Sequence, residues 1–122
     1  MARNILVVDD ALSVRQLVRS TLESDGFTIE EAVDGKEAIA KLGQQKFELI
    51  ITDLNMPNLG GMDLLARVKG DRLHKFTPVL VMTTERSESR KDEARTAGAR
   101  AWITKPFLPS RLREAVGKLV PQ

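Results

Sequence analysis

Five short apolar runs alternate along the chain with longer segments of helical period. The runs are residues 5–8, 27–32, 47–52, 78–82 and 101–104. Three of them hold uninterrupted apolar stretches, "ILVV", "LII" and "VLVM", which are typical of strands buried on both faces of a parallel sheet. The second run, "FTIEEA", alternates at first and suits the edge of the sheet. This alternation predicts an α/β fold, a five-stranded parallel sheet with helices on both faces.

The segments between the runs carry apolar residues at the spacing of an amphipathic helix. The first presents Val14, Leu17, Val18 and Leu22, the third Met62, Leu65 and Val68, and the last Leu108, Leu112, Val116, Leu119 and Val120. In the second segment, Asp34 and Glu37 have the spacing of a capping box that begins a helix. The fourth segment, about residues 87–97, has only alanine on its apolar side, so we expect a weakly anchored helix there.

The composition limits the class of protein. With 122 residues, 42% of them hydrophobic and 30% charged, the chain fits one globular domain over residues 1–122. The absence of cysteine excludes disulfides and thiolate metal sites. The apolar run "ILVV" near the start is too short for a secretory signal, and no segment is apolar enough for a membrane span. We therefore expect a soluble, cytoplasmic protein.

The charge balance argues against nucleic acid as a partner. A net charge of +2 attracts a phosphate backbone only weakly. One Trp, four Phe and no Tyr form no platform on which bases could stack. We expect neither nucleic acid nor a membrane among the partners.

Two adjacent carboxylates, Asp9 and Asp10, end the first run in the sequence "VVDD". Like charges this close disfavour the doubly ionised state unless a positive group compensates them. The commoner use of such a residue is to bind free N–H groups where the next helix begins. Other parts of the sequence are needed to decide between these two uses.

Polar groups follow four of the five predicted strands. They are Asp9 and Asp10 after the first, Asp53 after the third, Thr83 and Thr84 after the fourth and Lys105 after the fifth. Each has an ordinary explanation by itself: a cap for Asp53 or Thr83, and a solvated surface position for Lys105. Ligands of open parallel sheets bind beyond the carboxyl ends of the strands, and chance would seldom gather all these residues there. Together they predict a binding site.

The chemistry of these side chains is mutually consistent. Three carboxylates in one place repel each other, and a hard divalent cation such as Mg2+ relieves that repulsion. Lys105 and Thr83 supply a cation and a hydroxyl that bind phosphoryl oxygens. A carboxylate in this setting is able to act as a nucleophile and become an aspartyl phosphate. Asp53, central in the predicted sheet, is the candidate.

Taken in order, the motifs resemble the receiver domains of two-component response regulators, most closely the single-domain chemotaxis regulators. They are "VVDD", Asp53-x-Asn55-x-Pro57 followed by Gly61, "TTE" after the fourth strand and "KPF" after the fifth. The resemblance covers nearly the whole chain. It implies a flavodoxin-like (βα)5 sandwich with strand order 2-1-3-4-5, an order that the periodicity does not provide. It also implies a phosphorelay protein rather than an enzyme with a separate turnover substrate.

The resemblance assigns roles around the acidic residues. Asp53 would accept a phosphoryl group from a sensor histidine kinase. Asp10, Asp53 and the backbone carbonyl of Asn55 would bind Mg2+, with Asp9 acting mainly through bound water. Asn55, together with Glu85 of the "TTE" motif, matches the pairing of regulators that lose their phosphate quickly, so we expect fast self-dephosphorylation.

The remaining implied roles concern the switch. Thr83, with Thr84 beside it, would turn toward the phosphoryl group and Lys105 would contact it, and the Lys105–Pro106 bond would be cis. Three residues before the lysine, receivers usually carry Tyr or Phe, but this chain has Trp102. The larger ring predicts crowding when it turns inward, and so altered coupling. The alternative is a partly buried aromatic that fills the sheet edge.

Lys and Arg outnumber Asp and Glu between residues 85 and 118. We expect a surface on the fourth helix, the fifth strand and the last helix that binds an acidic or amphipathic segment of a target protein, in chemotaxis or motility. This basic surface comprises Arg86, Arg90, Lys91, Arg95, Arg100 and Trp102. A solvated charged face is the alternative. Only Pro121 and Gln122 follow the last helix, so we expect no attached output domain. We expect a monomer, with a phosphorylation-dependent dimer left open.

Three other functions fit the pattern less well. Magnesium phosphatases with an Asp nucleophile carry a second Asp two residues later, where this chain has Asn55. Flavodoxin-like FMN binders need a loop rich in Ser, Thr and Gly after the first strand, where it has "DDALSVRQ". A histidine kinase or phosphohistidine carrier needs a reactive histidine, and His74, the only one, lies in a polar segment that we expect at the surface.

Overall fold

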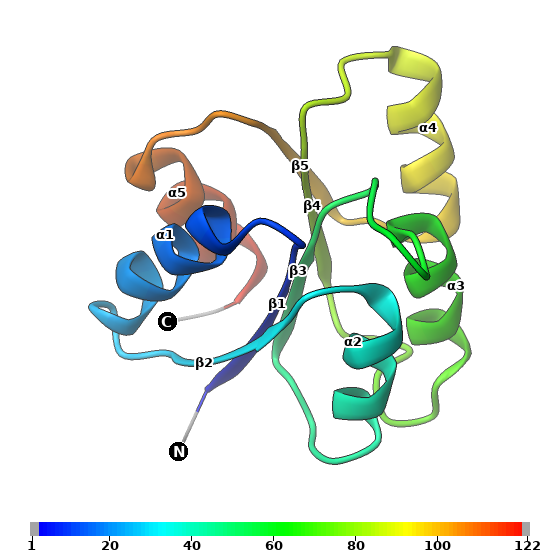
Figure 1. Ribbon diagram of the computed structural model, residues 1–122, viewed down its shortest axis with the longest axis horizontal. Coiled ribbons are helices and arrows are strands. Elements are labelled where there is room, and N and C mark those ends of the chain that lie inside the picture. The colour runs from blue at the N-terminus through cyan, green and yellow to red at the C-terminus, as the bar shows by residue number, and fades with distance from the viewer. Residues whose placement is uncertain (1–2, 121–122) are drawn as a thin grey trace.

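The computed structural model describes residues 3–120, in which five strands and five helices alternate strictly (Figure 1). The strands are β1 (Asn4–Val8), β2 (Thr28–Ala32), β3 (Leu49–Thr52), β4 (Val79–Thr83) and β5 (Ala101–Thr104). The helices are α1 (Leu12–Glu23), α2 (Gly35–Leu42), α3 (Gly61–Gly70), α4 (Glu88–Ala97) and α5 (Pro109–Leu119). None of the helices in this described part of the chain has the length and apolar character needed to cross a lipid bilayer.

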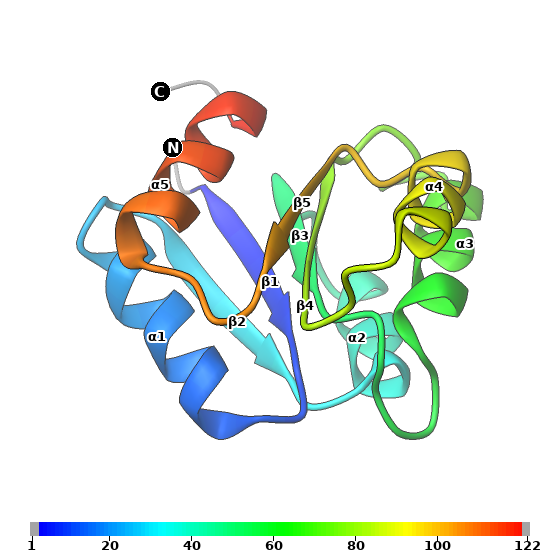
Figure 2. The same ribbon diagram turned by 90° about the horizontal axis from the view of Figure 1, so that it is seen from above.

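The strands form one parallel sheet in the order β2-β1-β3-β4-β5, which confirms the predicted fold class. β1 pairs with β2 on one side and with β3 on the other, so that Ile5 lies opposite both Ile29 and Leu49. The strand order therefore reverses at β1, and the carboxyl ends of β1 and β3 meet at this reversal. Figure 2 shows α1 and α5 on one face of the sheet and α2, α3 and α4 on the other.

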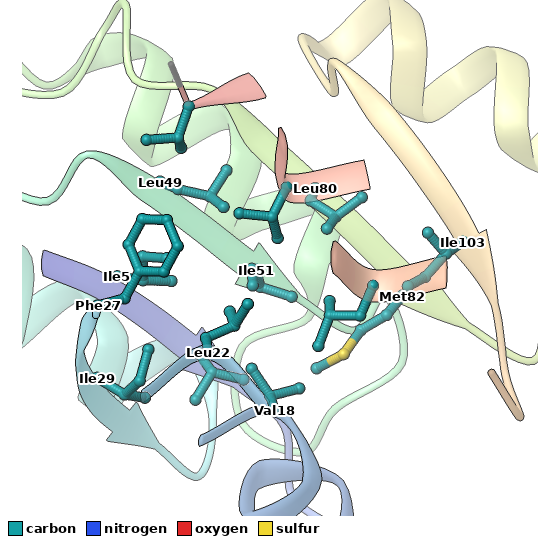
Figure 3. Packing of buried hydrophobic residues seen from close by; sticks show 14 residues of the cluster. Ile5, Val18, Leu22, Phe27, Ile29, Leu49, Ile51, Leu80, Met82 and Ile103 are labelled. Atoms are coloured by element: carbon teal, nitrogen blue, oxygen red, sulfur yellow. The ribbon is translucent and has the colours of Figure 1, made fainter. Parts of the chain in front are cut away.

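Successive residues of β1 belong to two separate hydrophobic cores, one on each face of the sheet. Ile5 and Val7 pack in the core beneath α1 and α5. Figure 3 shows Ile5 among the residues of this core. Leu6 and Val8 pack in the core beneath α2 and α3. All four side chains are fully buried, because a parallel strand between two helical layers has no solvent face. Burial on both faces of the sheet therefore explains why the run "ILVV" contains no polar residue.

Most of the predicted helical stripes face the sheet. Val18 and Leu22 of α1 and Leu112 and Val116 of α5 are buried. The assignment of Leu108 to the last stripe was wrong, because its side chain is 69% exposed. This residue is the N-cap of α5 and has extended backbone. A residue that precedes the first helical turn does not share the face of the helix that follows.

A side-chain cap explains where α2 begins, and sparse apolar burial explains why α4 is weakly anchored. Asp34 Oδ1 accepts a hydrogen bond from the Glu37 backbone N–H at 2.8 Å, and Glu37 Oε1 accepts one from the Val33 N–H at 3.2 Å. The first bond caps α2 at Asp34 as predicted. The second bond differs from that of a capping box, because Glu37 reaches the N–H of Val33, one residue before the N-cap, and not that of Asp34. Within α4, Ala94 is the one buried residue, so little apolar burial holds this helix to the sheet.

The prediction that His74 lies at the surface was wrong. The side chain is fully buried, and its Nε2 accepts a hydrogen bond from the Phe47 backbone N–H at 3.1 Å. Its Nδ1 lies 2.7 Å from Asp71 Oδ2. A backbone N–H only donates, so Nε2 is the unprotonated nitrogen and Nδ1 donates to the carboxylate. The imidazole provides a hydrogen-bond acceptor for the Phe47 N–H, which lies just before β3. The polar residues around His74 in the sequence do not indicate this distant contact.

Candidate functional site

The carboxyl ends of β1 and β3 bring three carboxylates together. Asp9, Asp10 and Asp53 each offer an oxygen, and these atoms lie within 4.8 Å of one another. Asp9 is fully buried and Asp53 is 8% exposed, whereas Asp10 is exposed to solvent. We call these three residues the acidic cluster. The parallel register explains it, because Val8 and Thr52 are paired and the next residue of each strand is an aspartate.

Asp9 combines the two uses that the sequence left open. Its Oδ1 accepts a hydrogen bond from the Ala11 N–H at 2.8 Å, just before α1 begins. Its Oδ2 lies 2.6 Å from Lys105 Nζ. Both oxygens of the Asp9 carboxylate therefore have a protein partner. This leaves Asp10 as the member of the pair whose carboxylate faces solvent.

Lys105 lies between the two buried carboxylates. Its Nζ is 2.6 Å from Asp9 Oδ2 and 3.1 Å from Asp53 Oδ2. Burial lowers the pKa of Lys105, but its hydrogen bonds to both carboxylates raise the pKa by more, so the ammonium stays charged. Burial raises the pKa of Asp9 by more than the hydrogen bonds from Lys105 and Ala11 lower it. One ammonium among three carboxylates leaves the site with excess negative charge when all are ionised.

The donor set fits a hard divalent cation. The acidic cluster offers oxygens only, and one of its members, Asp10, is open to solvent. Asn55 lies beside the acidic cluster, and the Asn55 backbone N–H donates to Asp53 Oδ1 at 3.4 Å. Mg2+ prefers a few carboxylate oxygens and keeps several waters. The residues present could therefore hold Mg2+, whose positive charge would offset the excess carboxylate charge.

The residues after β4 form a connected turn above the sheet. Thr83 is buried, and its Oγ1 accepts a hydrogen bond from the Glu85 N–H at 3.2 Å. Glu85 Oε1 accepts one from the Ser87 N–H at 3.0 Å, so this carboxylate supports the start of α4. Thr84 is exposed. The Lys105 backbone N–H donates to the Thr83 carbonyl at 2.8 Å, which joins the ends of β4 and β5.

Gly61 allows α3 to begin directly against the loop after Asp53. A Cβ on Gly61 would lie 2.3 Å from the Asp53 carbonyl oxygen and 2.7 Å from Leu54 Cα, which is closer than real Cβ contacts. The Gly61 N–H donates to the Leu54 carbonyl at 2.9 Å. Glycine at this position therefore lets the backbone of α3 support the loop that carries Asp53.

A groove opens beside Lys105 between α1 and the segment after β5. The Lys105–Pro106 peptide bond is cis, as the resemblance implies. The groove has a volume of about 410 Å³, and its lining includes Val14, Leu17, Thr84, Lys105 and Phe107. Its walls are mostly apolar, and Lys105 joins the groove to the edge of the site.

Trp102 is partly buried and packs against the core beneath α2 and α3. Lys91 Nζ lies 5.8 Å from the centre of its ring. Within the described part of the chain, Trp102 Nε1 is buried without a hydrogen-bond partner. The ring therefore fills part of the sheet edge and carries one unsatisfied donor.

The basic surface is largely neutralised by local ion pairs. Arg90 pairs with Glu93, Lys91 with Glu88 and Arg95 with Asp92, each three residues apart on α4. Arg86 and Arg100 are exposed at the two ends of the helix region. A groove of about 470 Å³ between α4, β5 and α5 has Trp102, Phe107 and Leu108 among its apolar lining, with Lys91, Arg95 and Arg111 among its polar lining. The surface thus combines paired charges with an apolar groove.

The sequence interpretation missed two residues next to the acidic cluster. The second strand seemed to contribute nothing, but Glu31 near its end accepts a hydrogen bond from Arg15 Nε at 2.9 Å. Arg15 Nη1 donates to the Asp9 carbonyl at 2.8 Å. The alternation of "FTIEEA" placed Glu31 on an edge strand, but no local pattern pairs it with a helix residue 16 positions away.

The chain is similar in sequence and fold to known proteins. Residues 5–117 match the family described as the response regulator receiver domain. The chain therefore belongs to the response regulator receiver domains, which are signalling modules of two-component systems.

Within this family the chain is similar to chemotaxis regulators. It is 38% identical to chemotaxis protein CheY-3 of Vibrio cholerae serotype O1 over 116 residues, which cover 94% of this chain and 89% of that protein. Chemotaxis protein CheY of Pseudomonas aeruginosa is also 38% identical, over 94% of each chain. The solved structure of chemotaxis protein CheY4 of Vibrio cholerae superposes with a TM-score of 0.94 at 39% identity, over 98% of this chain and 100% of that one. The chain is thus a CheY-like receiver.

Proposed function

We propose that this protein is a cytoplasmic response regulator that accepts a phosphoryl group from a sensor histidine kinase on Asp53. The observation that carries the proposal is the position of the Asp53 carboxylate. It lies at the open edge of the sheet, within the acidic cluster and 3.1 Å from the Lys105 ammonium. A carboxylate beside a cation and a potential metal site is suited to phosphoryl transfer.

In the proposed step, an Asp53 oxygen attacks the phosphorus of a phosphohistidine on the kinase. The new O–P bond forms as the N–P bond breaks, and the imidazole nitrogen keeps the electron pair of that bond. The product is an acyl phosphate on Asp53. Bound Mg2+, held by Asp10, Asp53 and the Asn55 carbonyl with Asp9 acting through water, would neutralise charge on the phosphoryl oxygens.

Lys105 and Thr83 supply the remaining contacts. The Lys105 ammonium, 3.1 Å from Asp53 Oδ2, is close enough to move onto a phosphoryl oxygen. Thr83 has to release the hydrogen bond from the Glu85 N–H before its hydroxyl is able to turn toward the phosphoryl group. This exchange couples the site to the turn that begins α4, and to Trp102 on the neighbouring strand.

The two grooves are suited to two partners. The groove that contains Lys105 and Phe107 lies beside the acceptor, and its apolar lining is suited to a helix of the kinase. The groove between α4, β5 and α5 is suited to a segment of a target protein that is acidic or amphipathic. Similarity to chemotaxis regulators supports a pathway in chemotaxis or motility.

Asn55 and Glu85 are proposed to shorten the lifetime of the phosphate. Asn55 is exposed next to the acceptor, and Glu85 lies two residues after Thr83. Both side chains are polar and able to engage an attacking water. In the structure Glu85 accepts a hydrogen bond from the Ser87 N–H. To engage an attacking water, its carboxylate has to release this bond and turn away from α4.

The proposal is tested by the intact mass of the protein after incubation with acetyl phosphate, with and without Mg2+. We expect a gain of one phosphoryl group that requires Mg2+ and is absent in Asp53→Asn. Asp63→Asn is the matched control, because Asp63 is an exposed acid in the first turn of α3. A gain of mass in Asp53→Asn, or no gain in the wild type under any condition, would contradict the proposal.

A further inference from the structure

Arg15 links the edge strand β2 to the acidic cluster without entering the cluster. Its side chain is only 12% exposed. Its Nη1 donates to the backbone carbonyl of Asp9 at 2.8 Å, and its Nε donates to Glu31 Oε1 at 2.9 Å. The other oxygen of Glu31 accepts a hydrogen bond from Arg19 Nε at 2.6 Å. Glu31 therefore holds the guanidinium of Arg15 in one orientation.

The carbonyl that Arg15 binds lies where the chain leaves the sheet. The Asp9 N–H still donates to the Ala32 carbonyl at 3.1 Å, and the Asp53 N–H donates to the Val8 carbonyl at 3.1 Å. Beyond these bonds the chain turns into α1. The Asp9 carbonyl belongs to the planar peptide group that joins Asp9 to Asp10, so a donor that fixes this oxygen also fixes the direction of the Asp10 backbone.

This restraint matters most for Asp10. Asp9 is buried, and both of its carboxylate oxygens have partners. Asp10 is exposed, and the orientation of its backbone decides where its carboxylate points. A rotation of the peptide between the two residues would move the Asp10 carboxylate away from Asp9 and Asp53.

We propose that Arg15, held by Glu31, is a positioning residue for divalent-cation binding at the acidic cluster. The guanidinium of Arg15 fixes the Asp9–Asp10 peptide so that the carboxylates of the acidic cluster converge on one cation. The inference rests on the proposed function, because it requires the cluster to bind Mg2+. It assigns the edge strand a part in the site, through a residue that touches neither the cation nor the phosphoryl group.

A purely electrostatic role of Arg15 predicts the opposite result. Loss of a positive charge close to an anionic site should strengthen the binding of a cation. Loss of a positioning contact should weaken it, as removal of the groups that orient metal ligands does in other sites. Arg15→Lys separates charge from geometry, because an ammonium keeps the charge but is unable to reproduce the rigid fork that contacts two oxygens.

The test is the dissociation constant of Mg2+, measured by titration calorimetry on the full chain. We expect about tenfold weaker binding in both Arg15→Ala and Arg15→Lys, and a smaller loss in Glu31→Gln. Arg19→Ala is the matched control, because it removes the other arginine of Glu31 and leaves the bond from Arg15 to Asp9 in place. Its dissociation constant should stay within about twofold of wild type. Urea unfolding of each variant identifies any that do not fold, and Arg15→Lys carries the test if Arg15→Ala does not.

Unchanged or tighter Mg2+ binding in the folded Arg15 variants would overturn the inference. The same follows if Arg19→Ala weakens binding as much as Arg15→Lys, because the effect would then come from general destabilisation. These outcomes leave the proposed function intact as long as the wild type binds Mg2+ and Asp10→Asn abolishes that binding. Absence of Mg2+ binding in the wild type would instead overturn both.

Discussion

Lys105 Nζ lies 2.6 Å from Asp9 Oδ2, although the two residues are 96 positions apart in the chain. The contact gives the buried carboxylate of "VVDD" a positive partner within the protein itself. It also joins the end of β5 to the end of β1, on either side of Asp53. Electrostatic compensation of the acidic cluster is therefore shared between a lysine and the cation that the cluster is proposed to bind.

Lys105→Met removes this charge and keeps most of the length of the side chain. We expect the metal-free protein to lose about 3 kcal/mol of unfolding free energy at pH 7, because Asp9 keeps the hydrogen bond from the Ala11 N–H but is left as a buried carboxylate without a cation. We also expect tighter Mg2+ binding, since one positive charge has left the site. Urea unfolding and titration calorimetry measure the two effects. Lys118→Met, whose side chain is 74% exposed on α5, is the control and should change stability by less than about 0.5 kcal/mol. Equal stability of the Lys105 variant and wild type would refute this expectation.

Gly61→Ala should distort the loop that carries Asp53. The added Cβ would meet the Asp53 carbonyl oxygen at 2.3 Å, so the loop or α3 has to move. We expect a loss of about 2 kcal/mol in unfolding free energy and slower phosphorylation by acetyl phosphate, followed by intact mass. Gly70→Ala, at the other end of α3, places its Cβ in open space and should be neutral or slightly stabilising. A phosphorylation rate in Gly61→Ala equal to that of Gly70→Ala would show that the close contact has no effect on the site.

His74→Ala should destabilise the protein although it lies at the opposite end of the sheet from the acidic cluster. It leaves the Phe47 N–H without its acceptor and opens a cavity, so we expect a loss of about 3 kcal/mol in chemical denaturation. Lys75→Ala changes the exposed neighbour and should lie within about 0.5 kcal/mol of wild type. Mg2+ binding should be unaffected in folded His74→Ala. A similar small effect for both variants would mean that the imidazole is not needed at this position.

Glu31 should make stability depend on pH. Burial raises the pKa of Glu31, but hydrogen bonds from Arg19 and Arg15 lower it by more, and the pKa lies below its ordinary value of 4.5. The carboxyl therefore binds its proton less tightly in the folded state, and it stabilises the fold above that ordinary value. This stabilisation is lost as the pH falls through the lowered pKa. We expect Glu31→Gln to cost about 1 kcal/mol at pH 7. The difference from wild type should shrink as the pH falls below 4.5 and through the lowered pKa, as measured by urea unfolding at pH 7 and at an acidic pH. A difference that is the same at both pH values would contradict the ionic role.

Part of the site followed from the sequence because the required signals are local. Asp9, Asp53, Thr83 and Lys105 each stand at or just after a strand, and parallel strands deliver their carboxyl ends to one edge. The N-cap of α2 at Asp34 follows from a signal that is local in the same sense. Leu108 shows where such signals fail, since its spacing fits the helical stripe although the helix begins one residue later.

By itself, the sequence determined the α/β alternation, the edge position of the second strand and the set of polar residues at the strand ends. Periodicity and strand boundaries involve neighbouring residues, which sequence patterns describe directly. Only the tertiary structure decided that His74 is buried against Phe47, that Asp9 faces Lys105 while Asp10 faces solvent, and that Glu31 holds Arg15 against the Asp9 carbonyl. These contacts join residues that are far apart in the chain. Their hydrogen-bond geometry depends on the strand register and the helix packing of the whole fold, which local sequence patterns do not describe.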